Sequence, residues 1–122
     1  MVNCQYAYKF KFYGSTFAFK FPSMVLCEGY KVQPSQITLV ISNTVEGRDI
    51  TVNSITVGSC SGAFNTELVG GAVSSSNFVV SGGCNNGAVK SSYKGEITIG
   101  YTEKKTSLTK TMLGNLNAKV EP

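Results

Sequence analysis

The stretch from Lys94 to Val120, KGEITIGYTEKKTSLTKTMLGNLNAKV, decides the fold of this chain. Its first part alternates apolar and polar residues and ends at Thr102, and the polar segment 103–106 supplies a turn before a second long strand. One face of the first strand carries Ile97, Ile99 and Tyr101, and one face of the second carries Leu108, Met112, Leu116, Ala118 and Val120. Since side chains of a strand alternate between its two faces, this pattern predicts an antiparallel hairpin with one buried face.

The composition extends this interpretation to the whole chain. The chain has 122 residues, of which 42% are hydrophobic, and this is enough for one domain with a hydrophobic core. We therefore expect a single domain at residues 1–122. The apolar residues are mainly Val, Ile, Leu, Phe and Tyr among many Ser, Thr, Asn and Gly, and no segment keeps a helical apolar period over three turns. We therefore expect an all-β protein, a two-sheet antiparallel β-sandwich of about eight or nine strands.

The middle of the chain predicts another hairpin. A short strand at Tyr30 to Val32 precedes Ile37 to Ser42, whose odd-numbered apolar residues point inward. The turn residues Asn43 to Arg48 then lead into a strand from Asp49 to Val57. The apolar phase of that last strand shifts at Asn53-Ser54, which indicates a β-bulge.

An aromatic hairpin is the strongest local pattern near the N-terminus. Residues Tyr6 to Phe21, YAYKFKFYGSTFAFKF, alternate on both sides of Gly14-Ser15, where Gly comes first as a type II′ turn requires. The resulting register, within a hairpin of about residues 5–22, puts the large rings on one face. This aromatic face consists of Tyr6, Tyr8, Phe10, Phe12, Phe17, Phe19 and Phe21.

The aromatic face has three possible uses. It can cap the sandwich core, which we favour, or it can act as an assembly strand that inserts into a neighbouring subunit. A stacking platform for sugars or single-stranded nucleic acid is the third, and it requires exposed rings.

Four cysteines form an even set without any C-x-x-C spacing, which favours disulfides and an exported protein over a zinc site. The register of the aromatic hairpin brings Cys4 near Cys27, and this pairing leaves Cys60 for Cys84. Two other connectivities remain open. The Gly-, Ser- and Asn-rich segment Gly58 to Gly87 predicts edge strands and loops.

The sequence contains few residues that could support catalysis or bind a cofactor. The chain has no His, so Ser-His and Cys-His nucleophiles are excluded. Glu46 and Asp49 lie in one loop and could together bind a cation. Calcium sites within a single loop normally have more oxygen ligands, so we favour the interpretation that both carboxylates are solvated turn residues. The net charge of +4 is scattered rather than gathered into a basic stripe. We expect no enzyme activity, no cofactor, no metal and no nucleic-acid partner.

From Tyr30 onward the sequence resembles archaeal pilin-like extracellular domains. The resemblance rests on YKV (residues 30–32), QITLVISNTVEGRDITVNSITVGSC (36–60), GGCNNGA (82–88) and YKGEITIGYTEKKTSLTKTMLGNLNAKVE (93–121), in this order. It implies an immunoglobulin-like or pilin-like sandwich at the cell surface, a structural role in a filament or pilus, self-association into a homopolymer and a Cys60 to Cys84 bridge. It assigns no catalytic residue.

The chain departs from this family at its N-terminus. Members begin with a processed signal and a hydrophobic helix, whereas no signal peptide or membrane-spanning run is found here. Either such a helix has been removed, or assembly uses a terminal donor strand, for which Val2 to Phe12 is the preferred segment. The alternative function is a secreted monomeric module that binds carbohydrate or a cell-surface partner through an exposed aromatic face.

Overall fold

The computed structural model describes residues 2–4, 25–71 and 75–122 of the chain, and they form strands without any helix. The aromatic hairpin of residues 6–21 lies outside this part, so the expected total of eight or nine strands is not tested. The strands are β1 (Val2–Cys4), β2 (Val25–Gln33), β3 (Gln36–Asn43), β4 (Ile50–Val57), β5 (Cys60–Leu68), β6 (Ser75–Val80), β7 (Ser92–Glu103) and β8 (Thr109–Lys119).

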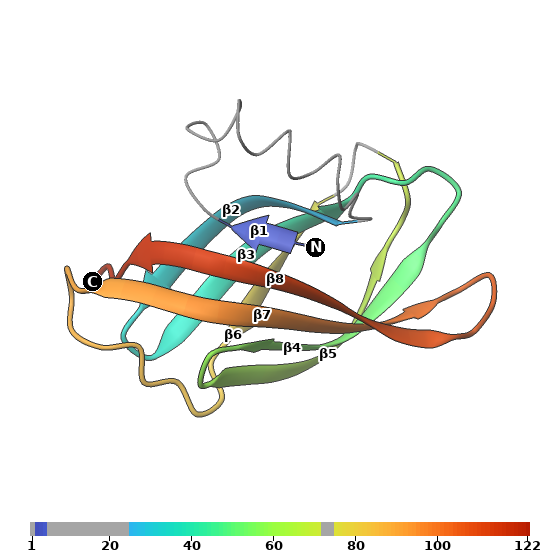
Figure 1. Cartoon of the computed structure of the whole chain (residues 1–122). Helices are drawn as coiled ribbons and strands as arrows, with labels where there is room; N and C mark the ends of the chain where they lie inside the picture. The colour runs from blue at the N-terminus through green and yellow to red at the C-terminus, as the bar shows by residue number, and fades with distance from the viewer. Residues whose placement is uncertain (1, 5–24, 72–74) are drawn as a thin grey trace.

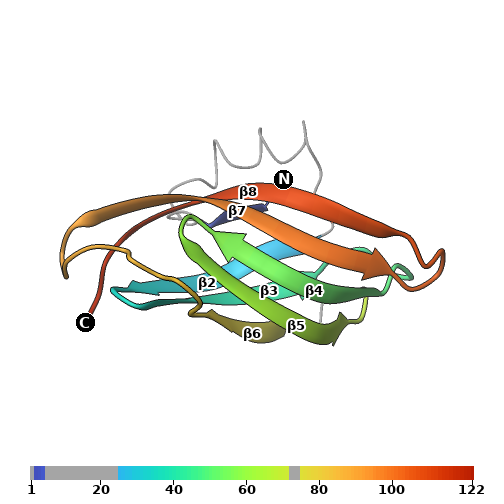
Figure 2. The same ribbon diagram turned by 90° about the horizontal axis from the view of Figure 1, so that it is seen from below.

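The strands form two sheets that lie face to face (Figures 1 and 2). The larger sheet has the order β1-β8-β7-β4-β5 and the smaller sheet the order β2-β3-β6. Strands β2 to β8 pair only antiparallel to one another, and the short β1 adds to the edge of the larger sheet parallel to β8. The expectation of an all-β protein with two antiparallel sheets is confirmed.

The core consists of the inward faces of both sheets, and 15 of its 20 buried residues are Val, Ile or Leu. Such residues suit strands because their branched side chains pack well on a pleated surface. The largest side chains that are completely buried are Phe78, Ile37, Leu39, Ile41, Ile50, Ile55, Leu68, Ile97, Ile99 and Leu116.

The predicted C-terminal hairpin is confirmed. Strands β7 and β8 pair from Ser92 with Lys119 to Thr102 with Thr109 without a register shift, and the apolar face of β7 is buried. The prediction for Leu108 is wrong, because this side chain is 54% exposed. It precedes β8, in the turn where Ser107 has a φ of 59°, and so it escapes the alternation of the strand.

The β-bulge predicted at Asn53-Ser54 is confirmed, but the hairpin around it is not. The register shifts between Val52 and Ser54 in the pairing of β4 with both β5 and β7. Strand β3, however, pairs with β2 and β6 rather than with β4. The segment 44–49 therefore crosses from one sheet to the other, a connection that has the same turn composition as a hairpin loop.

Strand β2 is longer than the short strand predicted at Tyr30 to Val32. It starts at Val25, and its register with β3 shifts between Cys27 and Gly29. This bulge changes the inward positions from Val25 and Cys27 to Val32, so the sequence shows no continuous alternation.

One isolated β-bridge on each side of the sandwich joins the two sheets. On one side Ser61 of β5 and Gly82, which follows β6, exchange two backbone hydrogen bonds of 2.8 and 2.9 Å. On the other side Val32 of β2 forms a bridge with Val120, and the Glu121 amide donates to the Val32 carbonyl at 2.7 Å. As predicted for Gly58 to Gly87, β5 and β6 are edge strands.

Candidate functional site

The predicted site residues are the four cysteines and the aromatic face. The structure describes only cysteines among them. Cys60 and Cys84 form a disulfide, and Cys27 is also disulfide-bonded. The backbone of Cys4 lies in β1, which contacts β2, but its side chain is outside the described part of the chain. The pairing of Cys4 with Cys27 therefore stays a prediction, as does every proposed use of the aromatic face.

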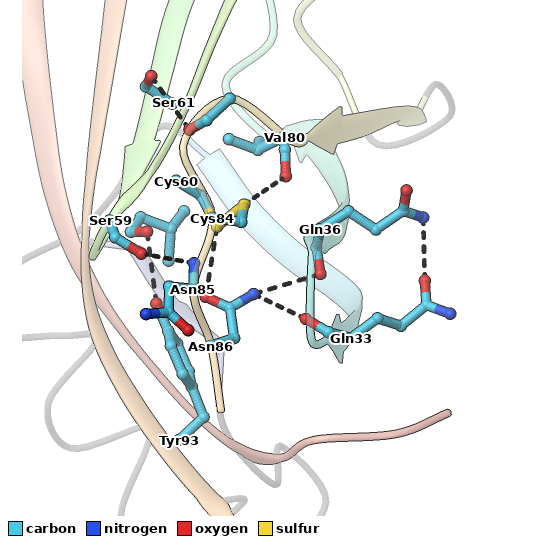
Figure 3. The surroundings of a disulfide bond; sticks show 12 residues. Gln33, Gln36, Ser59, Cys60, Ser61, Val80, Cys84, Asn85, Asn86 and Tyr93 are labelled. Atoms are coloured by element: carbon cyan, nitrogen blue, oxygen red, sulfur yellow. Dashed lines mark hydrogen bonds between the residues drawn. A yellow bond between two sulfur atoms is a disulfide. The ribbon is translucent and has the colours of Figure 1, made fainter. Parts of the chain in front are cut away.

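The Cys60–Cys84 disulfide joins the two sheets at one end of the sandwich (Figure 3). Cys60 is the first residue of β5 and is fully buried, whereas Cys84 lies in the loop after β6. The cross-link therefore holds an edge strand of one sheet against the loop that leaves the edge strand of the other.

A buried asparagine fixes the loops around this disulfide. The Asn86 amide donates to the Gln33 carbonyl at 2.7 Å, the Asn86 backbone donates to the Pro34 carbonyl at 3.1 Å, and Asn86 Oδ1 lies 3.4 Å from Cys60 Sγ. In Figure 3, Asn86 stands between the disulfide and the turn that connects β2 with β3. A buried amide without hydrogen-bond partners costs free energy, so the contacts of Asn86 are expected to be kept. Through them Asn86 connects the β2–β3 turn to the disulfide. Sequence reasoning missed this residue, although it lies in the GGCNNGA motif.

Tyr93 covers the neighbouring surface. Its hydroxyl donates to the Val57 carbonyl at 3.3 Å, and burial raises the pKa of the phenol. The ring lies so close to Gly95 that a Cβ there would come within 2.8 Å of a ring carbon. The glycine is therefore needed for packing, and this end of the sandwich is a structural unit.

The opposite end of the sandwich contains a charge cluster formed by Arg48, Glu103 and Lys110. Glu103 is only 6% exposed and accepts ion-pair contacts from Arg48 and, at 2.6 Å, from Lys110. These contacts, first the hydrogen bond from Lys110 and then that from Arg48, lower the pKa of the Glu103 carboxyl. The cluster joins the segment after β3 to the β7–β8 hairpin.

Asn43 and Asp49 bind the loops beside this charge cluster. Asn43 is fully buried and donates from its amide to the carbonyls of Arg48 at 2.6 Å and Leu68 at 3.2 Å. Asp49 Oδ1 accepts from the Gly70 amide at 2.8 Å. Asp49, considered above as a cation ligand with Glu46, thus joins two loops. Within residues 2–4, 25–71 and 75–122, no group of three or more acidic or cysteine side chains could hold a metal ion.

Acid should weaken the charge cluster. Because the pKa of Glu103 is lowered on folding, its contribution to stability is complete above the ordinary carboxyl pKa of about 4.5 and is lost as the pH falls through the lower value in the folded protein. Urea midpoints between pH 6 and pH 2 should therefore fall less steeply below pH 4.5 for Glu103→Gln than for the wild type. Glu121→Gln, at an exposed position, serves as the control and should keep the wild-type slope. Identical slopes for Glu103→Gln and wild type would contradict this assignment.

Two long stretches of strand edge in the larger sheet, besides the short stretch Asn117 to Lys119 at the end of β8, have no partner strand among the described residues. Strand β1 pairs only with Gly114 to Leu116 of β8, so the outer side of Thr109 to Leu113, called here the β8 edge, is unpaired. At the other end of the sheet, β5 pairs with β4 and forms the bridge at Ser61, so the outer side of Gly62 to Leu68, called here the β5 edge, is also unpaired. Unpaired edges present backbone groups that can bind another strand.

The outer face of β7 and β8 carries an open depression of about 360 Å³. Its lining is polar and consists of Lys94, Gly95, Glu96, Asn115 and Asn117. Such a shallow, mixed-charge surface offers hydrogen bonds but encloses no reacting group, whereas ligand sites are usually concave and largely apolar.

No helix in the described part of the chain is long and apolar enough to cross a membrane. Comparison of the sequence with protein-family models finds no matching family, and comparison with curated proteins finds no match. The strand edges, the disulfide end and the charge cluster are therefore the features from which a function can be argued.

Proposed function

We propose that this protein is a structural, non-catalytic subunit of an archaeal extracellular filament or pilus, which assembles by β-strand contacts between subunits. The proposal joins the resemblance to pilin-like domains with the strand edges of the larger sheet. In this role the two-sheet sandwich is a rigid building block, and the disulfide suits an oxidising location at the cell surface.

The observation that carries the proposal is the β8 edge. Strand β8 has eleven residues, but β1 covers only the stretch Gly114 to Leu116 on its outer side. Leu108 and Leu113, which flank the remaining edge, are 54% and 53% exposed. Proteins normally protect such edges, because an unpaired strand with exposed apolar residues adds strands from other chains.

Lys110 would be the expected protection of this edge, since an exposed lysine discourages strand addition. Its ammonium, however, lies 2.6 Å from Glu103 Oε1, so its charge is largely compensated within the subunit. The edge is thus left receptive to a strand from another subunit.

The donor-strand form of this proposal assigns the added strand to Val2 to Phe12. The described residues Val2 to Cys4 pair with β8 of the same chain, and the segment beyond Cys4 lies outside the described part. A donor strand from this segment stays a prediction, as does the monomeric binding module that would use the aromatic face.

Mass distribution in solution distinguishes a filament subunit from a monomeric module. We expect the oxidised protein to form species of increasing mass as its concentration rises, measured by size-exclusion chromatography with light scattering. If coding sequence is found upstream of Met1, the comparison should include a chain that carries it. A single monomer peak for both chains at all concentrations would overturn the filament proposal and favour the binding module.

A further inference from the structure

The two unpaired edges of the larger sheet lie at opposite ends of the same strand order. We infer that the β8 edge of one subunit pairs with the β5 edge of the next copy of this chain, so that the larger sheets form one continuous sheet along the filament. This inference rests on the proposed function and names the surfaces through which the subunits would meet.

Symmetry favours pairing between different edges. A contact of the β8 edge with a second β8 edge uses the same surface on both copies and closes as a dimer. A contact between the β8 edge and the β5 edge leaves one edge of each kind free at the ends of every assembly, so further copies can add without limit. With a single kind of contact, only the second arrangement produces a polymer from these two surfaces.

The charged side chains of the two edges are compatible with this contact, because each already has a partner within its own subunit. The β5 edge, GAFNTEL, carries one negative side chain, Glu67, and the β8 edge, TKTML, carries one positive side chain, Lys110. These two side chains are 44% and 45% exposed. Within the subunit Glu67 is paired with Lys104 and Lys110 with Glu103, each at 2.6 Å, so neither edge brings an uncompensated charge into the contact.

The exposed apolar side chains near the two edges fit this contact. Leu113 at one end of the β8 edge and Val69 directly after the β5 edge are 53% and 51% exposed. The inward side of β5 is also incompletely covered, because Phe64 and Thr66 are only partly buried. Addition of a neighbouring strand would remove apolar surface from water at both places.

Cysteine cross-linking tests the arrangement directly. Asn65→Cys places a thiol on the β5 edge and Thr111→Cys places one on the β8 edge, and both positions are exposed. Filaments grown from an equal mixture of the two variants and treated with a short bismaleimide should yield covalent dimers. Filaments of either variant alone should yield no covalent dimer, because the introduced cysteine of each subunit then faces an edge that has no introduced cysteine. Thr56→Cys, exposed on the interior strand β4, is the matched control and should give no dimer in any mixture.

A second measurement avoids substitutions at the edges. Filaments of unmodified protein, assembled from equal amounts of ¹⁴N- and ¹⁵N-labelled chains, are treated with a carbodiimide and digested. Peptides that join Glu67 of one isotope to Lys110 of the other would support the contact.

The outcomes separate the two proposals. Filaments that give covalent dimers from a single variant, or no dimer from the mixture and no mixed-isotope link, would overturn the pairing of β8 with β5 while the filament function stands. Failure to form filaments both by this chain and by a chain extended with any upstream coding sequence would overturn the proposed function and this inference with it.

Discussion

Replacing Phe78 with alanine is expected to lower the free energy of unfolding by about 3 to 5 kcal/mol. Phe78 lies on the edge strand β6, yet it is only 1% exposed, and its ring meets that of Phe64 edge-on with the centroids 5.1 Å apart. The two rings pack β5 against β6 across the sandwich. Loss of the Phe78 ring would leave a cavity beside Phe64 in the core.

Urea denaturation with the disulfides intact measures this effect. Val79→Ala is the matched control, because Val79 is the next residue of the same strand and is 48% exposed. Its cost should stay below about 1 kcal/mol, the range of strand propensities. A cost of less than about 1 kcal/mol for Phe78→Ala as well would contradict the packing of β5 on β6.

The double substitution Cys60→Ala with Cys84→Ala is expected to lower the free energy of unfolding by about 3 kcal/mol. The cross-link spans 24 residues, and its removal increases the conformational freedom of the unfolded chain. Alanine is chosen because Cys60 is fully buried, and a serine hydroxyl would add the cost of burying a polar group.

Thermal or urea unfolding of the oxidised proteins provides the comparison. Ser61→Ala is the control, since Ser61 is the exposed neighbour of Cys60 on β5 and its substitution should change stability by less than about 0.5 kcal/mol. If the double variant unfolds at the same urea concentration as wild type, the disulfide does not hold the two sheets together in the way described.

The strands that could be predicted from the sequence are those with one face fully buried. Ile97, Ile99 and Tyr101 alternate with less buried residues because the opposite face of β7 is partly accessible to solvent, and the shift of phase at Asn53 marks the bulge of β4. Both the buried face of β7 and the bulge of β4 are directly visible in the order of apolar and polar residues.

The pairing of strands could not be predicted in the same way. The alternation of β3 and β4 is the same whether they form a hairpin or lie in different sheets, so the sequence does not distinguish these arrangements. In β5 the inward positions include Gly62 and Thr66, because this strand is only partly covered by the smaller sheet. An edge strand of this kind lacks a strong apolar pattern.

The polar residues that connect the loops could not be predicted from the sequence either. Asn43, Asn86 and Glu103 resemble ordinary turn residues in the sequence, and all three are buried in the structure. Their partners are distant in the chain; the Asn86 amide, for example, donates to a carbonyl 53 residues away. Such contacts depend on the tertiary fold, which residue type and spacing do not encode locally.

Negative-stain electron microscopy of the oxidised protein, with and without any coding sequence found upstream of Met1, tests the central claim most directly. The claim is that this two-sheet domain is a filament subunit. We expect filaments of uniform width with a regular subunit repeat, formed by at least one of the two chains. Separate particles of the size of one 13.0 kDa domain in both preparations, at concentrations up to the limit of solubility, would contradict it.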